Sequence, residues 1–152
     1  MISYPLTFTA KAQTNQGAKS DWSSFAAQKD FENSTGELQC GIPTDFGGSG
    51  TGSSPEDFFI LALMNCYVAT FKVIAARMKI EYESLSANAE LRLDKDADGQ
   101  PWMTSAALRF DLHGAKDADR ALRIMNQVSK QCMIINSVKT DVTFDLHVNE
   151  RL

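Results

Sequence analysis

The residues of this sequence with the widest chemistry are its three cysteines, Cys40, Cys66 and Cys132. A deprotonated thiol is a nucleophile that is oxidised by peroxides, exchanges with disulfides and binds metals. A cysteine inside an apolar segment can equally serve as a small buried side chain without a reaction of its own. The surroundings of each cysteine therefore have to be considered before a role is assigned.

The three cysteines stand in different surroundings. Cys66 lies in the middle of a long apolar segment, where burial is the simplest interpretation. Cys132 follows Ser129-Lys130-Gln131, where we expect a chain turn, so its thiol would be partly exposed beside a positive charge. Cys40 stands near the start of a loop and is most simply a bystander. Residue type alone leaves a structural and a reactive use open.

Other kinds of site fit the sequence poorly. The cysteines are 26 and 66 residues apart without a C-x-x-C pair, and His113 and His147 fall in expected strands, which does not fit zinc. Gly47 to Gly52 match half of a phosphate-binding loop, but Ser53 stands where that loop requires lysine. No G-x-S-x-G element marks a serine nucleophile. We therefore expect neither a metal nor a nucleotide cofactor.

Length and composition are those of one globular domain spanning residues 1–152. The net charge is −4 and the isoelectric point about 5.1, which disfavours nucleic acid because phosphate binding needs clustered Lys and Arg. The N-terminus lacks a signal-peptide pattern, so we expect the chain to act in the cytoplasm. The apolar stretch from Phe58 to Met78 predicts a core helix, not a membrane span, because polar residues interrupt it: Asn65, Thr70, Lys72 and Arg77.

The central elements must position these residues. Residues 41–54 are rich in glycine and serine and predict a loop. Residues 54–57 then supply a serine N-cap, a proline at the first helical position and two acids in the first turn, which predicts a helix to about Met78. Apolar residues occupy nearly every face of this helix, so we expect a second subunit to cover it.

The remaining elements predict an α+β fold. Residues 4–12 and 20–26 show loose alternation and predict short strands. Residues 82–93 and 104–112 alternate more clearly on either side of a polar turn and predict a β-hairpin. Residues 117–130 predict a one-sided helix, and residues 139–148 predict a last strand. Strands, a long helix, a hairpin, a helix and a strand in that order are an α+β pattern.

The entry of the long helix and the spacing of two cysteines together resemble the OsmC/Ohr family of organic hydroperoxide reductases. The matching features are Gly50-Thr51-Gly52-Ser53-Ser54-Pro55-Glu56, Cys66 ten residues after the glutamate, and Cys132 at the end of the later helix. The resemblance covers residues 36–148. It implies an OsmC-like fold with strands around a long central helix, an intertwined homodimer, active sites at the subunit interface, and thiol-dependent reduction of organic peroxides.

The resemblance also implies roles for individual residues. Cys66 would be the peroxidatic thiol, Cys132 the resolving thiol, and Glu56 the carboxylate that orients the family's catalytic arginine. The Cys66 thiolate would attack the peroxide, release an alcohol and become a sulfenic acid, which Cys132 would convert to a disulfide. A cellular dithiol would then reduce this disulfide, as expected of an antioxidant protein of the stress response.

Two departures from the family pattern weigh on these roles. The family arginine comes from the N-terminal region, but this chain has no Arg before Arg77. The only cations there are three lysines: Lys11, Lys19 and Lys29. Met133 stands where the family often has proline after the resolving cysteine. The missing arginine favours an alternative, a non-enzymatic OsmC-like module that binds an apolar small molecule at the dimer interface or senses redox state through its thiols.

Helix geometry adds an expectation about Glu56. Ten residues of α-helix rise about 15 Å, so Glu56 cannot approach Cys66 of its own straight helix. Either the helix breaks between them or the Glu56 of a neighbouring subunit reaches the site, and we favour the second because no Pro or Gly interrupts the segment. Stabilising the helix N-terminus is an equally good use of this carboxylate.

Overall fold

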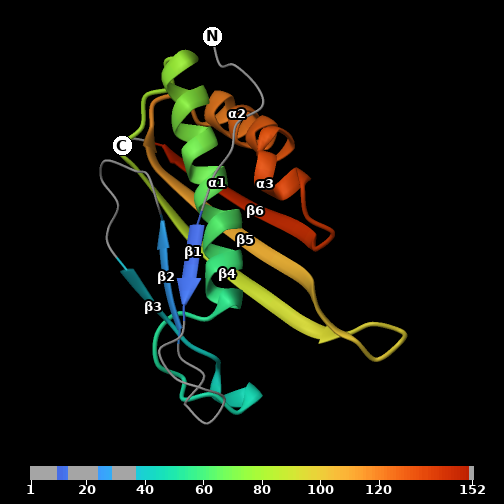
Figure 1. Ribbon diagram of the computed structural model, residues 1–152. Coiled ribbons are helices and arrows are strands. Elements are labelled where there is room, and N and C mark those ends of the chain that lie inside the picture. Colours follow the sequence, from blue (N-terminus) through green and yellow to red (C-terminus); the bar gives the residue numbers. More distant parts are fainter. Residues whose placement is uncertain (1–9, 14–23, 29–36, 151–152) are drawn as a thin grey trace. The chain divides into compact units, whose positions relative to one another are not determined.

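The computed structural model describes residues 10–13, 24–28 and 37–150 (Figure 1). The chain divides into two compact units, Met1–Phe58 and Phe59–Leu152, and each unit is described by itself.

The first unit contains a three-stranded antiparallel sheet in the order β1-β2-β3. Its strands are β1 (Ala10–Gln13), β2 (Ser24–Gln28) and β3 (Glu37–Cys40). The strands predicted at 4–12 and 20–26 overlap β1 and β2 in part, while residues 4–9 and 20–23 lie outside the described residues. The sequence analysis missed β3, because its 4 residues are too few to establish alternation.

The predicted loop at 41–54 is confirmed and is held together by its own backbone. It contains a single 3₁₀ turn, η1 (Thr44–Phe46), and its ends are joined by a parallel bridge between Cys40 and Ser53. The amide of Gly41 donates to Ser53 O over 3.1 Å. A Cβ at Gly41 would collide with the carbonyl oxygen of Thr51, so glycine is required where the two loop arms meet.

The long helix α1 (Pro55–Arg77) begins where the sequence predicts. Ser54 Oγ accepts from the Asp57 amide over 3.1 Å, and Asp57 Oδ2 accepts from the Ser54 amide over 2.9 Å. This reciprocal pair is a capping box that satisfies two of the amides a helix N-terminus leaves free. The helix is continuous for 23 residues.

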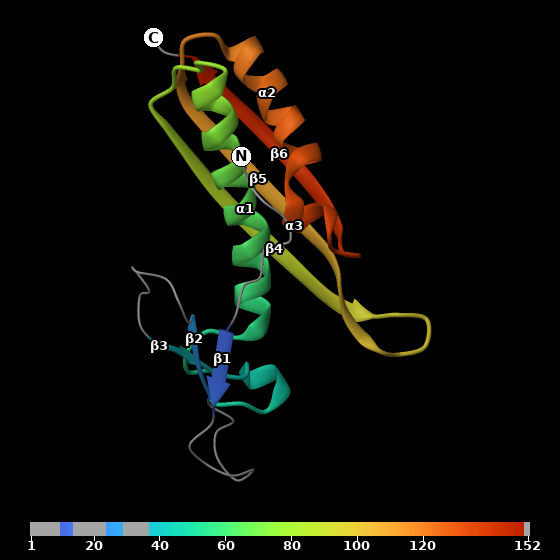
Figure 2. The same cartoon turned by 45° about the horizontal axis from the view of Figure 1, so that its top comes forward.

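The second unit is built on a three-stranded sheet in the order β4-β5-β6. The strands β4 (Ser84–Lys95) and β5 (Pro101–Ala115) form the predicted hairpin. β6 (Asp141–Glu150) pairs parallel to β5, which requires a crossover connection. α2 (Ala118–Gln131) and the short α3 (Met133–Asn136) provide that crossover, and α1 and α2 cover the same face of the sheet (Figures 1 and 2).

The core of this unit lies between the two helices and the sheet. α1 contributes a stripe that repeats every fourth residue, Leu63, Tyr67, Phe71 and Ala75. α2 contributes Ala121, Ile124, Met125 and Val128, and β5 contributes alternate residues from Ala106 to Leu112. The Tyr67 ring stacks on Phe110 with centroids 3.8 Å apart. This packing fixes the two helices against one sheet face.

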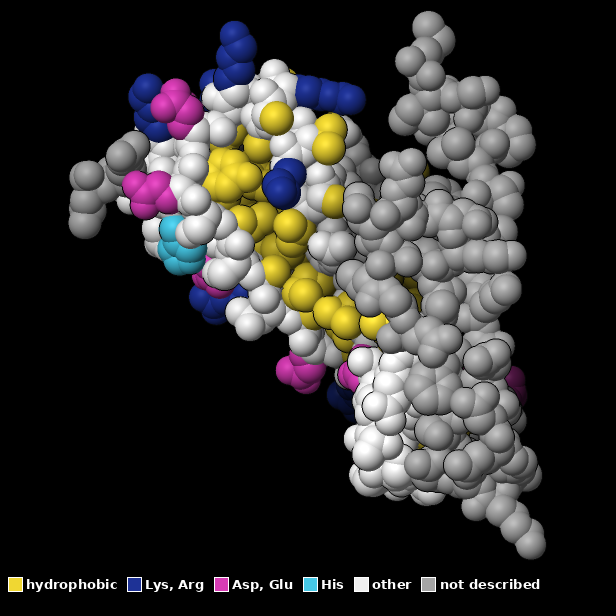
Figure 3. Space-filling view, turned by 60° about the vertical axis from the view of Figure 1, so that its left-hand side comes forward, with side chains coloured by type: hydrophobic (Ala, Val, Ile, Leu, Met, Phe, Trp, Pro, Cys, Tyr) yellow, Lys and Arg dark blue, Asp and Glu magenta, His cyan; other side chains and the backbone are white. Residues whose placement is uncertain are grey.

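Only part of α1 is covered by the chain itself. By length and composition α1 could cross a membrane, yet only 22% of its most apolar 18-residue window is buried. Leu61 is 48% exposed and Val73 is 51% exposed. Figure 3 shows hydrophobic side chains gathered in a band on the face seen from the left-hand side of Figure 1. The buried stripe identifies α1 as a core helix of this unit, and its other faces remain available for contact.

Candidate thiol site

The two cysteines of the second unit come together although 66 residues separate them in sequence. Cys66 lies on α1 and is partly exposed, whereas Cys132 directly follows α2 and is fully buried. Their side chains are close enough for the two thiols to interact, and both cysteines are reduced. The structure therefore places one accessible and one inaccessible sulfur next to each other.

Cys132 occupies the junction between two helices. Its amide donates to Val128 O over 3.1 Å, and its carbonyl accepts from the Asn136 amide over 3.0 Å. Burial, and then the hydrogen bond to Cys66, raise the pKa of the Cys132 thiol to about 11. The amides of Ile135 and Ile134 partly oppose this rise. The Cys132 thiol is consequently protonated at neutral pH, and the expectation from the sequence that it is partly exposed is wrong.

Tyr67 joins the two helices that carry the cysteines. Its hydroxyl donates to the carbonyl oxygen of Met125 on α2 over 2.9 Å, inside the core. Burial raises the pKa of Tyr67 well above its ordinary value, so the hydroxyl keeps its proton and remains a donor. The sequence analysis did not single out Tyr67. The available signal was a tyrosine inside an apolar helix, because a buried hydroxyl must find a partner.

Glu56 lies in the first turn of α1 and is partly buried. Its Oε2 is shielded from solvent and receives no hydrogen bond from the described residues. Asp57, not Glu56, forms the capping box with Ser54. Because α1 is continuous, the break that would bend Glu56 toward Cys66 of the same helix does not occur. A carboxylate oxygen that is shielded from water and receives no hydrogen bond lowers the stability of the folded state. We therefore expect this atom to have a partner from elsewhere.

The remaining candidates belong to the first unit. Cys40 is buried in the first unit, where its thiol points to Leu38 O at 3.5 Å. Of the three N-terminal lysines, Lys11 lies on β1, and Lys19 and Lys29 fall outside the described residues.

Among the residues that the structure describes, no group of His, Cys, Asp and Glu is arranged to hold a metal ion. The two histidines lie on strands as expected, His113 on β5 and His147 on β6. His147 Nε2 is 2.7 Å from Asp145 Oδ1, and His113 Nε2 is 3.4 Å from Ser86 Oγ. These contacts hold both rings within the sheet.

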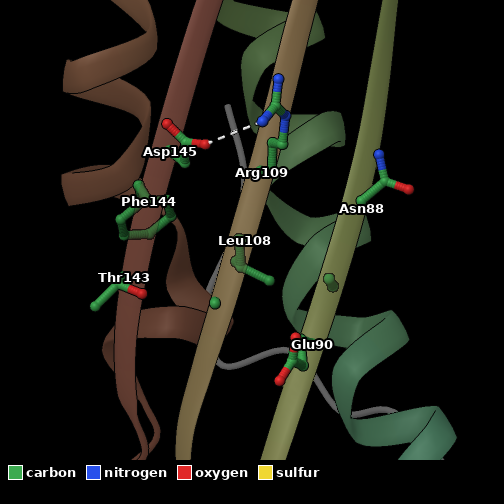
Figure 4. Close-up of a pocket in the computed structure, with 9 residues that line it drawn as sticks. Asn88, Glu90, Leu108, Arg109, Thr143, Phe144 and Asp145 are labelled. Carbon is green, nitrogen blue, oxygen red and sulfur yellow. Dashed lines mark hydrogen bonds and ion pairs between the residues drawn. The ribbon is translucent and has the colours of Figure 1, made fainter.

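A shallow groove of about 370 Å³ crosses the strands β4, β5 and β6 (Figure 4). Arg109 projects from β5 between the buried Leu108 and Phe110, and its Nη1 is 3.5 Å from Asp145 Oδ2. A second contact, 3.0 Å long, joins its Nη2 to Asp111 Oδ1. The guanidinium of Arg109 is thus paired with the carboxylates of Asp111 and Asp145. No cysteine lines the groove, which is separate from the thiol site.

The chain is similar to known proteins in sequence and in fold. The family model described as OsmC-like protein matches residues 48–147. An uncharacterised protein of Acinetobacter baylyi is 21% identical over 115 residues, which cover 74% of this chain and 77% of the relative.

The chain is also similar to solved structures, of which two are described. An OsmC-like protein of unknown function from Vibrio cholerae has a TM-score of 0.78 at 20% identity, covering 93% of this chain and 99% of its own. An organic hydroperoxide resistance protein, OsmC, from Legionella pneumophila has a TM-score of 0.73 at 20% identity, covering 97% and 99%. At this identity the solved structures establish the fold, which is the α+β fold predicted from the sequence.

Proposed function

Because the chain belongs to the OsmC/Ohr family, we propose that it is a thiol peroxidase that reduces organic hydroperoxides through Cys66 and Cys132. The observation that carries the proposal is the interaction of these two reduced thiols, which lie far apart in the sequence. The family match covers both cysteines. The Legionella pneumophila protein with the same fold is an organic hydroperoxide resistance protein, which points to the same substrate class.

The exposure of the two sulfurs supports one order of reaction. Cys66 is partly exposed and can meet a peroxide, whereas Cys132 is fully buried and cannot. The Cys66 thiolate attacks the terminal peroxide oxygen, the O–O bond breaks, and the alkoxide takes up a proton and leaves as the alcohol. Cys66 is then a sulfenic acid. In the proposed reaction, the thiol that reacts with this sulfenic acid is held next to it inside the protein. That thiol is Cys132.

The second step closes the disulfide. The sulfur of Cys132 attacks the sulfenic sulfur of Cys66, a disulfide bond forms, and the hydroxyl leaves as water with the proton from Cys132. Two electrons from an external dithiol then break the disulfide and restore both thiols. The first attack of that reductant falls on Cys66, because its sulfur is the exposed one of the pair.

Apolar surface near the pair favours an organic peroxide over hydrogen peroxide. Met133 directly follows Cys132 and is 72% exposed, and the next residue, Ile134, is 40% exposed. An alkyl or aryl group removed from water against such surface gains roughly 25 cal/mol per Å². The same contacts offer nothing to hydrogen peroxide.

The proposed active form is a homodimer, in which a second copy covers the open faces of α1. The exposed Leu61 and Val73 would be buried in that interface. The second copy would also bring a cation to the shielded Oε2 of Glu56 and toward the thiol site. With no arginine before Arg77, the candidates are Lys11, Lys19 and Lys29. A lysine ammonium can stabilise a nearby thiolate, although it lacks the planar fork of arginine.

Steady-state turnover of cumene hydroperoxide and of hydrogen peroxide, with a dithiol reductant, tests the function. The proposal expects repeated turnover with a higher kcat/KM for cumene hydroperoxide, lost in Cys66→Ser and retained in Cys40→Ser. Consumption of at most one peroxide molecule per Cys66 would contradict the proposed enzymatic function. In that case the chain would be a non-enzymatic module that binds an apolar molecule or senses redox state, an alternative that the missing arginine favours.

A further inference from the structure

Tyr67 connects α1, which carries Cys66, to α2, which Cys132 directly follows, through a hydrogen bond. It directly follows Cys66 on α1, and its hydroxyl donates to Met125 O on α2 over 2.9 Å. Met125 precedes Cys132 by seven residues, which is two helical turns, so both project from the same side of α2. Met125, Val128 and Cys132 are all fully buried along that side. The hydrogen bond between Tyr67 and Met125 therefore lies on the same buried side of α2 as Cys132.

The tyrosine ring and its hydroxyl make separate contributions. The ring stacks on Phe110 of β5, with centroids 3.8 Å apart and planes 19° from parallel, and so fixes α1 to the sheet. The hydroxyl instead links α1 to α2 beside Cys66. Met125 O lies inside a helix and keeps its intrahelical partner without Tyr67. Removing the hydroxyl alone therefore removes this link between the helices and leaves no buried acceptor unpaired.

Disulfide formation is the step most sensitive to the distance between α1 and α2. A disulfide has a narrow geometry, with a short S–S bond and a restricted torsion angle, so small changes in helix spacing alter how often the sulfurs meet correctly. Attack of a peroxide on Cys66 needs no contribution from α2. The spacing of the two helices should thus control the second step of the reaction and not the first.

We propose that Tyr67 is a positioning residue for disulfide formation: its hydroxyl holds α2 against α1 so that Cys132 meets the oxidised sulfur of Cys66. The inference deepens the proposed peroxidase function and relies on it only for the oxidant. In the step concerned, the Cys132 thiol and the Cys66 sulfenic acid give one disulfide and one water. Tyr67 touches neither reacting sulfur in this account and acts through the placement of α2.

The experiment uses Tyr67→Phe in a single turnover with cumene hydroperoxide. Dimedone trapping follows the Cys66 sulfenic acid, and the loss of free thiol follows the disulfide. We expect oxidation of Cys66 at the wild-type rate and disulfide formation slowed by roughly tenfold or more, so that sulfenic acid accumulates. Disulfide formation at the wild-type rate in Tyr67→Phe would overturn the proposal.

Two matched controls separate positioning from general stability. Tyr82→Phe removes a hydroxyl from another aromatic of this core, whose ring packs against Phe71 with centroids 5.4 Å apart. Ile124→Val removes one methylene from the buried face of α2 and lowers stability without touching the Tyr67 bond. Both variants should form the disulfide as fast as wild type. If Ile124→Val slows it as much as Tyr67→Phe does, lost stability explains the effect and the proposal is overturned.

Equilibration with glutathione tests the same bond without a peroxide. The ratio of disulfide to dithiol protein at fixed glutathione reports the effective concentration of one thiol at the other. Tyr67→Phe should lower this ratio by roughly the factor seen in the rate. If hydroperoxide fails to oxidise wild-type Cys66 while this ratio still falls in the variant, the peroxidase function is lost and the positioning role is supported. An unchanged ratio would count against the positioning role.

Discussion

Cys66 and Cys132 are both reduced, but one is partly exposed and the other is fully buried. Burial is the largest of the causes that raise the pKa of Cys132 to about 11. A buried, protonated thiol is a poor target for solvent oxidants. It is also a slow nucleophile until it loses its proton, which has a consequence for the pH dependence of the reaction.

Disulfide formation should accelerate with pH while the attack on peroxide need not. At pH 7 a thiol with a pKa of about 11 is deprotonated in roughly one molecule in ten thousand. The fraction of Cys132 thiolate, and with it the rate of disulfide formation, should rise about tenfold per pH unit between about pH 7 and 10. Stopped-flow measurement of disulfide formation after mixing with cumene hydroperoxide gives this profile. A flat profile would mean that proton loss from Cys132 does not limit the step.

Glu56 and Asp57 are adjacent acids with different surroundings. Asp57 forms the capping box with Ser54, whereas Glu56 keeps a shielded oxygen without a described donor. We expect Glu56→Gln to lower turnover roughly tenfold, by releasing the cation it orients, with little change in stability. Asp57→Asn should change turnover little but should lower the free energy of unfolding by about 0.3–1 kcal/mol. Turnover and urea unfolding of both variants provide the comparison, and equal turnover in the two would remove Glu56 from the site.

At the scale of the elements, the chain that follows α1 passes through a residue whose backbone conformation is unfavourable for its side chain. Met78 N donates to Ile74 O over 2.8 Å, and Ile80 N donates to Ala75 O over 2.9 Å as the chain reverses. Lys79 between them has a φ of 53°, the left-handed region that favours glycine. Side chains other than glycine pay about 1–2 kcal/mol there, of which part is offset by the lower flexibility of the unfolded chain.

Lys79→Gly should therefore stabilise the protein by about 1 kcal/mol. The side chain of Lys79 is exposed, so its loss removes little packing. Urea unfolding should show a higher midpoint at an unchanged slope, and Lys79→Ala should leave the midpoint close to wild type. A lower midpoint for Lys79→Gly would show that the lysine side chain stabilises the helix end by more than its backbone strain costs.

The elements that could be predicted are those with strong local signals. The caps and the first-turn acids located the start of α1 to the residue, and one-sided periodicity located α2 to within one residue at each end. β3 and α3 were missed, since each has 4 residues and no period to detect. The parallel pairing of β5 with β6 depends on how the crossover packs, and strand patterns alone do not encode it.

The candidate site was proposed by a different route. The resemblance to the family implied roles for Cys66 and Cys132, whereas local pattern alone favoured burial for Cys66 and exposure for Cys132. The structure reverses that order, because Cys132 sits at the closed junction of α2 and α3. The Tyr67 bond to Met125 links residues 58 apart and follows only from the packing of α1 on α2.

At the scale of the whole molecule, the open faces of α1 make the proposed dimer testable by a single charge. Val73 is 51% exposed on α1, and Lys72 beside it is also exposed. Val73→Glu would bury an unpaired charge in the interface and should weaken association by at least tenfold, with turnover falling in parallel. Lys72→Glu is the matched control, because it introduces the same carboxylate at a neighbouring position that is already charged. Sedimentation measures both, and a monomeric wild-type protein with full turnover would contradict the dimer.

The most direct test of the account is the state of Cys66 in Cys132→Ser after one equivalent of cumene hydroperoxide. Without its partner, the oxidised sulfur cannot form the intramolecular disulfide and should remain a sulfenic acid. Intact-mass and peptide analysis after dimedone treatment should find one adduct per chain, located on Cys66, with one cumyl alcohol released. The account is contradicted if Cys66 stays reduced, or if Cys40 carries the adduct instead.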